Sequence, residues 1–118
     1  RVGMAKLMYR PAGSLTLESS KRLELARALS IEPKMLLLDE ILAGLNASEV
    51  NASLDLIREF ARDDGLAVIM IEHILHAVMS LADRVVVLDH GQKIADDVPQ
   101  NVVLDPKVVA AYLGTEEE

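Results

Sequence analysis

The sequence of 118 residues has room for one domain, and its 51% hydrophobic and 26% charged residues exclude a disordered chain. It contains no cysteine, which excludes disulfide bonds and thiolate metal sites. The net charge of −7 argues against broad nucleic-acid binding, and part of the acidic excess forms a tail at Glu116–Glu118.

The first third of the chain predicts helices. Residues 1–9 read as the end of a helix that Pro11 and Gly13 interrupt, and they lack the apolar core of a signal peptide. Leucine and alanine spacing predicts a helix over residues 21–31, which Pro33 stops. No apolar stretch approaches the ~20 residues that cross a bilayer, so we expect no membrane insertion.

Two apolar runs in the middle of the chain predict strands, at residues 35–38 and 66–71. The first run does not alternate with polar residues, which is typical of a strand covered on both faces of a parallel sheet. Between the runs, Asn46 and Glu49 form the sequence of a capping box, which predicts the start of a helix that ends near Gly65. One face of this helix is expected to carry the apolar residues Val50, Leu54, Ile57 and Ala61.

The last third predicts a helix over residues 74–82, a strand over 85–88, a hairpin turn at 89–92 and a short strand over 93–95. Asp105 and Pro106 then predict a final helix through Leu113, which Gly114 ends. This order indicates the α/β fold class, with a mostly parallel sheet, flanking helices and a C-terminal hairpin.

Ionisable pairs follow the first two predicted strands: Asp39-Glu40 and Glu72-His73. Neighbouring parallel strands would bring the two pairs together, where ligands of α/β sheets bind. An aspartate there can hold Mg²⁺, and a glutamate can deprotonate a water that attacks a phosphate. The alternative is that the acidic pair simply ends a strand in solvent and that His73 is an ordinary surface or core histidine.

The ordered set of segments resembles the C-terminal half of an ATP-binding-cassette ATPase, which has a P-loop NTPase-like domain. MLLLDE at residues 35–40 resembles the Walker B strand, AGLN at 43–46 the D-loop, and IEH at 71–73 the strand that leads to the switch histidine. LTLESSKRLELARAL at residues 15–29 is similar to the signature motif with its helix. LADRVVVLDHGQKIADD is similar to the hairpin after the switch histidine, and RPAGSLTL and AAYLG resemble the branched-chain amino-acid transport branch.

The resemblance implies a role for each matched residue. Asp39 would assist Mg²⁺ through water, Glu40 would be the general base, and His73 would contact the γ-phosphate. The signature residues Leu15, Thr16, Leu17, Glu18 and Ser19 would cover the ATP held by a partner subunit, with a helix beginning near Ser20. The D-loop residues Ala43, Gly44, Leu45 and Asn46 would couple the two halves of a dimer.

The resemblance also implies an organisation. Residues 1–31 would end the helical subdomain, 32–98 would run from Walker B to the hairpin, and 99–118 would form a C-terminal helix and acidic tail. The complete subunit would pair with a second cassette subunit and a transporter membrane subunit at the cytoplasmic face of the inner membrane. It would couple ATP hydrolysis to import, with branched-chain amino acids as the expected cargo.

Two departures from the family pattern limit the expected activity. No Gly-rich loop with Lys-Ser/Thr occurs, so we expect weak or absent ATP and Mg²⁺ binding and no activity of this chain alone. Glu18 stands where the family has glycine, so Glu18→Gly is expected to raise ATP turnover in a full-length context. The alternative is that Glu18, Ser19 and Ser20 simply form a favourable helix start.

Two other functions remain open at this stage. In the first, the chain is a non-catalytic cassette half that self-associates through exposed sheet edges. The family places the Walker A strand between the strands at residues 66–71 and 85–88, so without it these strands are expected to close up or accept another chain. In the second, the chain is an unrelated α/β domain with incidental acidic strand ends.

Overall fold

The computed structural model describes residues 1–113, so the end of the last predicted helix at Gly114 and the acidic tail lie outside the described residues. These residues fall into two compact units that divide between His73 and Ile74, and each unit is described by itself. The first unit contains η1 (Ala5–Leu7), η2 (Ala12–Ser14), α1 (Leu17–Leu29), β1 (Met35–Asp39), α2 (Ala47–Asp63) and β2 (Ala67–Ile71). The second contains α3 (Leu75–Leu81), β3 (Val85–Asp89), β4 (Gln92–Asp97), α4 (Pro99–Val102), α5 (Pro106–Val108) and the π-helical turn η3 (Val109–Leu113).

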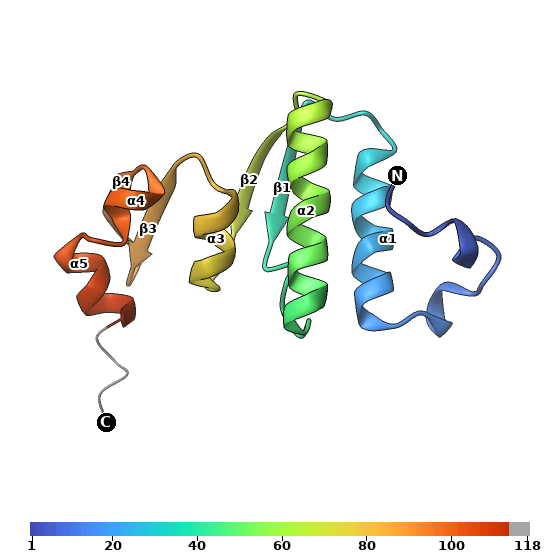
Figure 1. Cartoon of the computed structure of the whole chain (residues 1–118), viewed down its shortest axis with the longest axis horizontal. Coiled ribbons are helices and arrows are strands. Elements are labelled where there is room, and N and C mark those ends of the chain that lie inside the picture. Colours follow the sequence, from blue (N-terminus) through green and yellow to red (C-terminus); the bar gives the residue numbers. More distant parts are fainter. Residues whose placement is uncertain (114–118) are drawn as a thin grey trace. The chain divides into compact units, whose positions relative to one another are not determined.

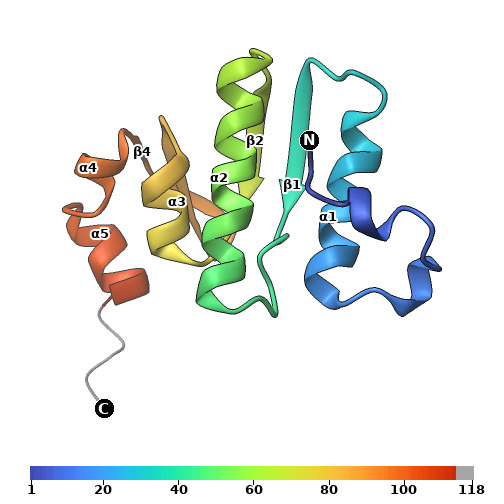
Figure 2. The same ribbon diagram turned by 45° about the vertical axis from the view of Figure 1, so that its right-hand side comes forward.

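The first unit is built on a parallel pair of strands, β1 and β2, in which Met35 pairs with Ala67 and Asp39 with Ile71. Helix α2 covers one face of this pair, and α1 lies close to both β1 and α2 (Figures 1 and 2). The parallel register makes both strands end at the same edge of the sheet, so the residues that follow them lie next to each other.

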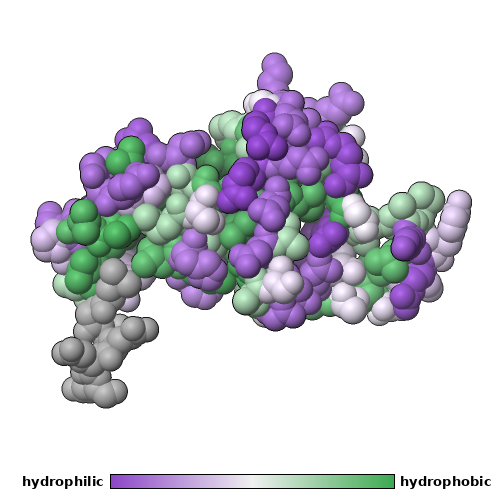
Figure 3. Space-filling model, in the orientation of Figure 1, coloured by the Kyte–Doolittle hydropathy of each residue, from purple (hydrophilic) through white to green (hydrophobic). Residues whose placement is uncertain are grey.

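Helix α2 begins at the capping box that its sequence predicts, and it buries most of the predicted apolar face. The Asn46 side chain accepts a hydrogen bond from Glu49 N–H at 2.9 Å, and the Glu49 carboxylate accepts one from Asn46 N–H at 3.0 Å. Val50, Leu54 and Ile57 are buried, as is Phe60, whereas the predicted Ala61 is only half-buried. Hydrophilic residues gather over the upper part of α2 in Figure 3, which agrees with a helix that buries one face only.

Two helix boundaries in the first unit differ from the prediction. Helix α1 begins at Leu17 rather than at Lys21 or Ser20, because Thr16 Oγ1 accepts a hydrogen bond from Ser19 N–H at 3.2 Å and so caps the helix earlier. Residues 1–9 form only the single 3₁₀ turn η1, without buried residues, so the predicted helix end is wrong there.

The expectation that the first strand is covered on both faces is also wrong for the described chain. Leu36 and Leu38 are buried toward the helices, whereas Met35 and Leu37 on the other face are 54% and 69% exposed. Their neighbours on β2, Ile69 and Ile71, are exposed as well. The continuous apolar run therefore reflects one face packed on α2 and one apolar face open to solvent.

The second unit is organised around the antiparallel hairpin of β3 and β4. His90 and Gly91 in its turn both have positive φ, which suits the twist of a two-residue hairpin, and the register shifts by one residue between Val87 and Leu88. Its core is formed by Val85, Val87, Val102 and Val108. Helix α4 was not anticipated; Val98 and Pro99 start it, and its Val102 is 1% exposed.

Strands β2 and β3 belong to different sheets and to different units, and their closing up against each other stays a prediction. Each sheet has two strands, and within the described residues β2 therefore has one edge without a partner strand. Filling of that edge by another chain stays a prediction.

Candidate functional site

The ends of β1 and β2 bring together three of the residues that the sequence singled out. Asp39 pairs with Ile71 in the sheet register, and Glu40 N–H donates a hydrogen bond to the Ile71 carbonyl at 2.9 Å. His73 follows two residues later, and its Nδ1 lies 3.9 Å from Glu40 Oε1. The expected convergence of the acidic pair and the imidazole at one sheet edge is therefore present in the fold.

This strand-tip cluster is open to solvent. The side chains of His73 and Glu40 are 66% and 57% exposed, and Asp39 is exposed as well. Residues 1–113 contain no group of three or more acidic, histidine or cysteine side chains arranged to hold a metal ion. As a single carboxylate, Asp39 can still accept hydrogen bonds from water bound to a metal ion. This suits Mg²⁺, because the ion retains waters while phosphate oxygens supply its other ligands.

The backbone at Glu40 adopts the left-handed conformation, with φ of +48°. This conformation is uncommon for a residue with a long side chain and persists only where surrounding contacts enforce it. Two contacts do so here: Glu40 N–H is bound to Ile71, and the Glu40 carbonyl accepts from Ala43 N–H at 3.3 Å. No turn residue such as glycine or asparagine marks this position, so the sequence carried no signal for it.

Glu72 is a site residue for which the sequence by itself predicts no separate role. Its Oε1 accepts a hydrogen bond from Leu42 N–H at 3.1 Å, which links the end of β2 to the loop that leaves β1. Its Oε2 is buried and has no hydrogen-bond partner among the described residues. The signal that was available is its place between a buried strand and His73.

The signature segment and the D-loop lie together in the first unit. Lys21 Nζ donates to the Ala43 carbonyl at 2.6 Å, which joins α1 to the loop. Gly44 has φ of +79°, which favours glycine, and a Cβ built on it would lie 2.8 Å from Leu17 Cδ2, so the end of that exposed side chain would have to shift.

The remaining residues of these two segments have local structural roles. Leu45 N–H donates to the Leu42 carbonyl at 3.2 Å, and Asn46 caps α2. Thr16 caps α1, while Leu15 precedes that cap and is half-buried. The helix start predicted as an alternative for residues 18–20 is therefore present, and it does not exclude the signature role.

Glu18 is neutralised locally by Arg22, one helical turn later. The Arg22 guanidinium forms an ion pair with the Glu18 carboxylate and also donates to the Val2 carbonyl at 3.1 Å. The Glu18 side chain is 19% exposed, and the Arg22 side chain is 26% exposed. Ser19 Oγ lies 3.5 Å from the Glu18 carboxylate. The charge that Glu18 presents at the start of α1 is therefore smaller than its sequence suggests.

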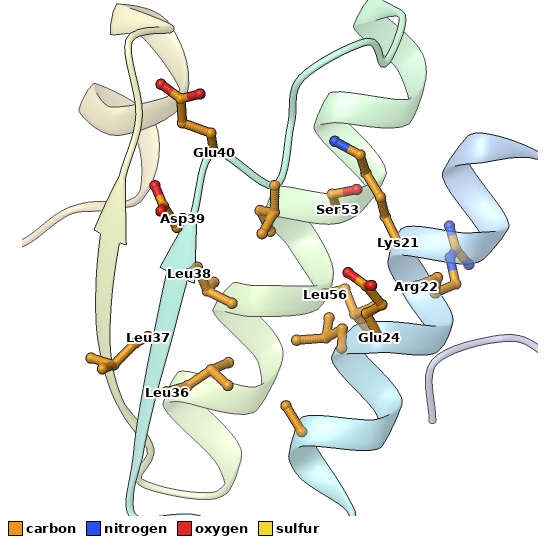
Figure 4. Close-up of a pocket in the computed structure, with 13 residues that line it drawn as sticks. Lys21, Arg22, Glu24, Leu36, Leu37, Leu38, Asp39, Glu40, Ser53 and Leu56 are labelled. Atoms are coloured by element: carbon orange, nitrogen blue, oxygen red, sulfur yellow. The ribbon is translucent and has the colours of Figure 1, made fainter.

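A groove of about 360 Å³ lies between α1, β1 and α2 (Figure 4). Lys21 and Ser53 line it beside Asp39 and Glu40, and the remaining lining residues are apolar apart from Arg22 and Glu24. Figure 4 shows the acidic pair at one end of β1, while Leu36 and Leu38 point into the groove and Leu37 points away. His73 is not part of its lining, so the groove shares only the acidic pair with the strand-tip cluster.

Comparison with known sequences finds transport ATP-binding proteins. Residues 92–118 match a family model described as a branched-chain amino acid ATP-binding cassette transporter. The high-affinity branched-chain amino acid transport ATP-binding protein BraF of Pseudomonas aeruginosa is 37% identical over 96% of this chain and 44% of its own length. The corresponding protein LivG of Escherichia coli is 35% identical over 97% of this chain and 45% of its own length. The chain therefore spans less than half the length of these curated relatives.

Solved structures of ATP-binding cassettes from ABC transporters are also similar to this chain. An ATP-binding cassette of an ABC transporter in its ADP conformation superposes with a TM-score of 0.86 at 33% identity, over 96% of this chain and 46% of that one. A nucleotide-free cassette from an ABC transporter superposes with a TM-score of 0.85 at 32% identity, over 94% of this chain and 45% of that one. No helix in the described part of the chain has the length and apolarity to span a membrane.

The sequence match and the structural match each extend over nearly the whole of this chain. The convergence of the two strand ends agrees with the motifs that led to the same assignment. The chain therefore belongs to the ATP-binding-cassette ATPase family and corresponds to the C-terminal part of such a subunit.

Proposed function

We propose that this chain supplies the water-activating acid and the signature segment of a cassette ATPase. In this proposal Glu40 accepts a proton from the attacking water, and His73 contacts the γ-phosphate. Asp39 holds the water shell of Mg²⁺, and the ion, when bound, neutralises charge on the phosphates. The observation that carries the proposal is the 3.9 Å separation of His73 Nδ1 and Glu40 Oε1 at one sheet edge.

The signature segment and the D-loop serve a second surface in this proposal. Residues 15–19 cover an ATP held by a partner cassette, and residues 43–46 couple the two halves of the dimer. The bond from Lys21 to the Ala43 carbonyl and the position of Leu17 beside Gly44 support it, because they bring the two segments together. The N-terminus of α1 lies within this segment, and the helix dipole favours an anion at such an end.

The wider assignment extends the same proposal to the complete protein. The relatives named above are transport ATP-binding proteins for branched-chain amino acids, which supports import of such amino acids. A second cassette subunit and a transporter membrane subunit would complete the assembly at the cytoplasmic face of the inner membrane. Since this chain has no Gly-rich phosphate-binding loop, we expect no ATP hydrolysis by the chain alone.

The test joins this chain to the part of BraF that lies N-terminal to the matched region. We expect the chimaera to hydrolyse ATP in a Mg²⁺-dependent way, and Glu40→Gln to lower kcat by about a hundredfold or more, as for loss of a general base. His73→Ala is expected to lower kcat as well. His76→Ala is the matched control, because His76 is an exposed histidine without a proposed role, and its variant should keep full activity. A chimaera that keeps its activity after Glu40→Gln would contradict the proposal.

A second candidate function is a non-catalytic association module. It is favoured by a specific observation: the apolar face of Met35, Leu37, Ile69 and Ile71 is exposed, and β2 has an edge without a partner strand in the described residues. Exposed apolar sheet surfaces and free edges promote pairing with another chain. Mg-ATP hydrolysis by the chimaera separates the two candidates, because only the first predicts turnover that Glu40→Gln lowers.

A further inference from the structure

The loop that leaves β1 is fixed at two points to the end of β2. The first is a backbone bond, from Glu40 N–H to the Ile71 carbonyl at 2.9 Å, which any residue at these positions could form. The second depends on one side chain: Leu42 N–H donates to Glu72 Oε1 at 3.1 Å. Only Ile41 separates Glu40 from Leu42, so the two bonds hold both ends of a very short segment.

This segment contains the left-handed residue of the site. Glu40 has φ of +48°, a conformation that a non-glycine residue keeps only when neighbouring contacts determine it. Leu42 is 0% exposed, so its backbone cannot move without moving a buried side chain. The bond that holds Leu42 N–H therefore limits how far the Glu40 backbone can relax toward the ordinary helical or extended regions.

The chemistry of Glu72 suits this task. A carboxylate accepts from a backbone N–H more strongly than a neutral group does. Its second oxygen, Oε2, is buried and has no partner in residues 1–113, so losing the Leu42 bond would leave both carboxylate oxygens without protein donors. Loss of this hydrogen bond would therefore be energetically costly, which favours the ordered conformation of the loop.

We propose that Glu72 is a positioning residue for Glu40. Its carboxylate holds Leu42 N–H and so keeps the β1 loop in the conformation that directs the Glu40 side chain toward His73. The assignment rests on the proposed function, in which Glu40 activates the water and a small displacement of the base lowers the rate. Glu72 itself neither contacts the nucleotide nor exchanges protons with it.

The test follows two backbone signals by NMR in the whole 118-residue chain. In Glu72→Ala we expect the hydrogen-exchange protection of the Leu42 amide to fall about tenfold, as for loss of one hydrogen bond. The intraresidue NOE between HN and Hα of Glu40, which is strong at positive φ because the two protons are close, should weaken toward that of a conformational average. Glu72→Gln retains an acceptor oxygen and should restore most of both signals, and Glu24→Ala, which removes an exposed carboxylate from α1, should change neither.

Two outcomes would overturn the assignment. One is an unchanged Leu42 protection and an unchanged intraresidue NOE of Glu40 in Glu72→Ala. The other is an equal loss of protection along all of β1 and α2, which would mean that Glu72 supports the fold in general. Kinetics of the BraF chimaera separate this inference from the proposed function. Glu72→Ala should lower kcat about tenfold without changing KM, whereas a chimaera that is inactive without any substitution would reject the function and leave the positioning result intact.

Discussion

Arg22 reduces the negative charge that the Glu18 carboxylate presents at the start of α1. The ion pair between them joins residues four apart in the helix, with the acid on the N-terminal side, which is the favourable order. Arg22 also binds the Val2 carbonyl, so its guanidinium is held in place from two sides. A carboxylate in the glycine position of the signature segment is therefore accompanied by its own counter-charge.

This pair leads to a prediction on ATP turnover. In the BraF chimaera, Glu18→Gly should raise turnover about fivefold, because like charges near 4 Å repel by at least ~1 kcal/mol. Arg22→Ala should lower turnover, since it exposes the unpaired carboxylate, and the double variant should resemble Glu18→Gly. Steady-state hydrolysis assays of the three variants measure this. If turnover is unchanged or lower in Glu18→Gly, Glu18 does not impair nucleotide use.

Individual side chains of the site were only partly predictable from sequence. The pairing of Asp39-Glu40 with His73 followed from the rule that parallel strands end at one edge, and the structure has it. The left-handed Glu40 and the bond from Leu42 to Glu72 were not predictable, because both depend on contacts between segments 30 residues apart. Local propensity carries no information on such contacts.

At the scale of elements, strong local signals predicted well and competing signals did not. The capping box of Asn46 and Glu49 and the hairpin turn at residues 89–92 are formed by neighbouring residues, and both were predicted. The start of α1 was placed too late, because three polar residues after Leu17 disguised a helical turn that Thr16 caps. The apolar run of β1 suggested two covered faces, yet hydrophobicity alone does not say what covers a face.

The hairpin of the second unit has a measurable dependence on pH. Arg84 Nε and Nη2 donate to the two oxygens of Asp96 at 2.6 and 2.8 Å, and this hydrogen-bonded pair lowers the pKa of Asp96 below its ordinary value of 3.8. The folded state therefore binds the proton less readily than the unfolded state does. The stabilisation is complete above about pH 4 and is lost as the pH falls through the lowered pKa.

We therefore expect Arg84→Ala to reduce the difference in unfolding free energy between about pH 7 and about pH 3. The pair is exposed, so its contribution should also decrease in high salt. Urea unfolding at the two pH values measures the difference. Arg27→Ala is the control, because it removes the same charge from an exposed position of α1 and should leave the pH dependence as it is. Equal pH dependence in Arg84→Ala and the unsubstituted chain would contradict the expectation.

At the scale of the whole molecule, the chain carries more exposed apolar sheet surface than a self-sufficient domain requires. Leu37 is 69% exposed on β1, and Ile69 and Ile71 are 54% and 59% exposed on β2. The curated relatives are more than twice as long as the region they share with this chain. Coverage of this face by further protein, from the same or another chain, agrees with both facts.

This surface gives a prediction on assembly. The chain should form dimers or larger species by itself, and Leu37→Lys should shift it toward the monomer, because a charge on the apolar face must be desolvated on association. Sedimentation velocity over a range of protein concentrations measures this. Leu104→Lys is the matched control, since Leu104 is 76% exposed but lies outside the sheet face. Monomeric behaviour of the unsubstituted chain, or equal effects of both variants, would argue against association through this face.

Because the backbone of Glu40 is left-handed, folding stability and the proposed chemistry favour different amino acids at this position. Glycine would relax the backbone there and raise the melting temperature, yet it would remove the proposed base. A β-branched residue would be strained in this conformation and would also lack the carboxylate. A variant of this chain that did not need hydrolysis would therefore gain most in stability from glycine or asparagine at this position.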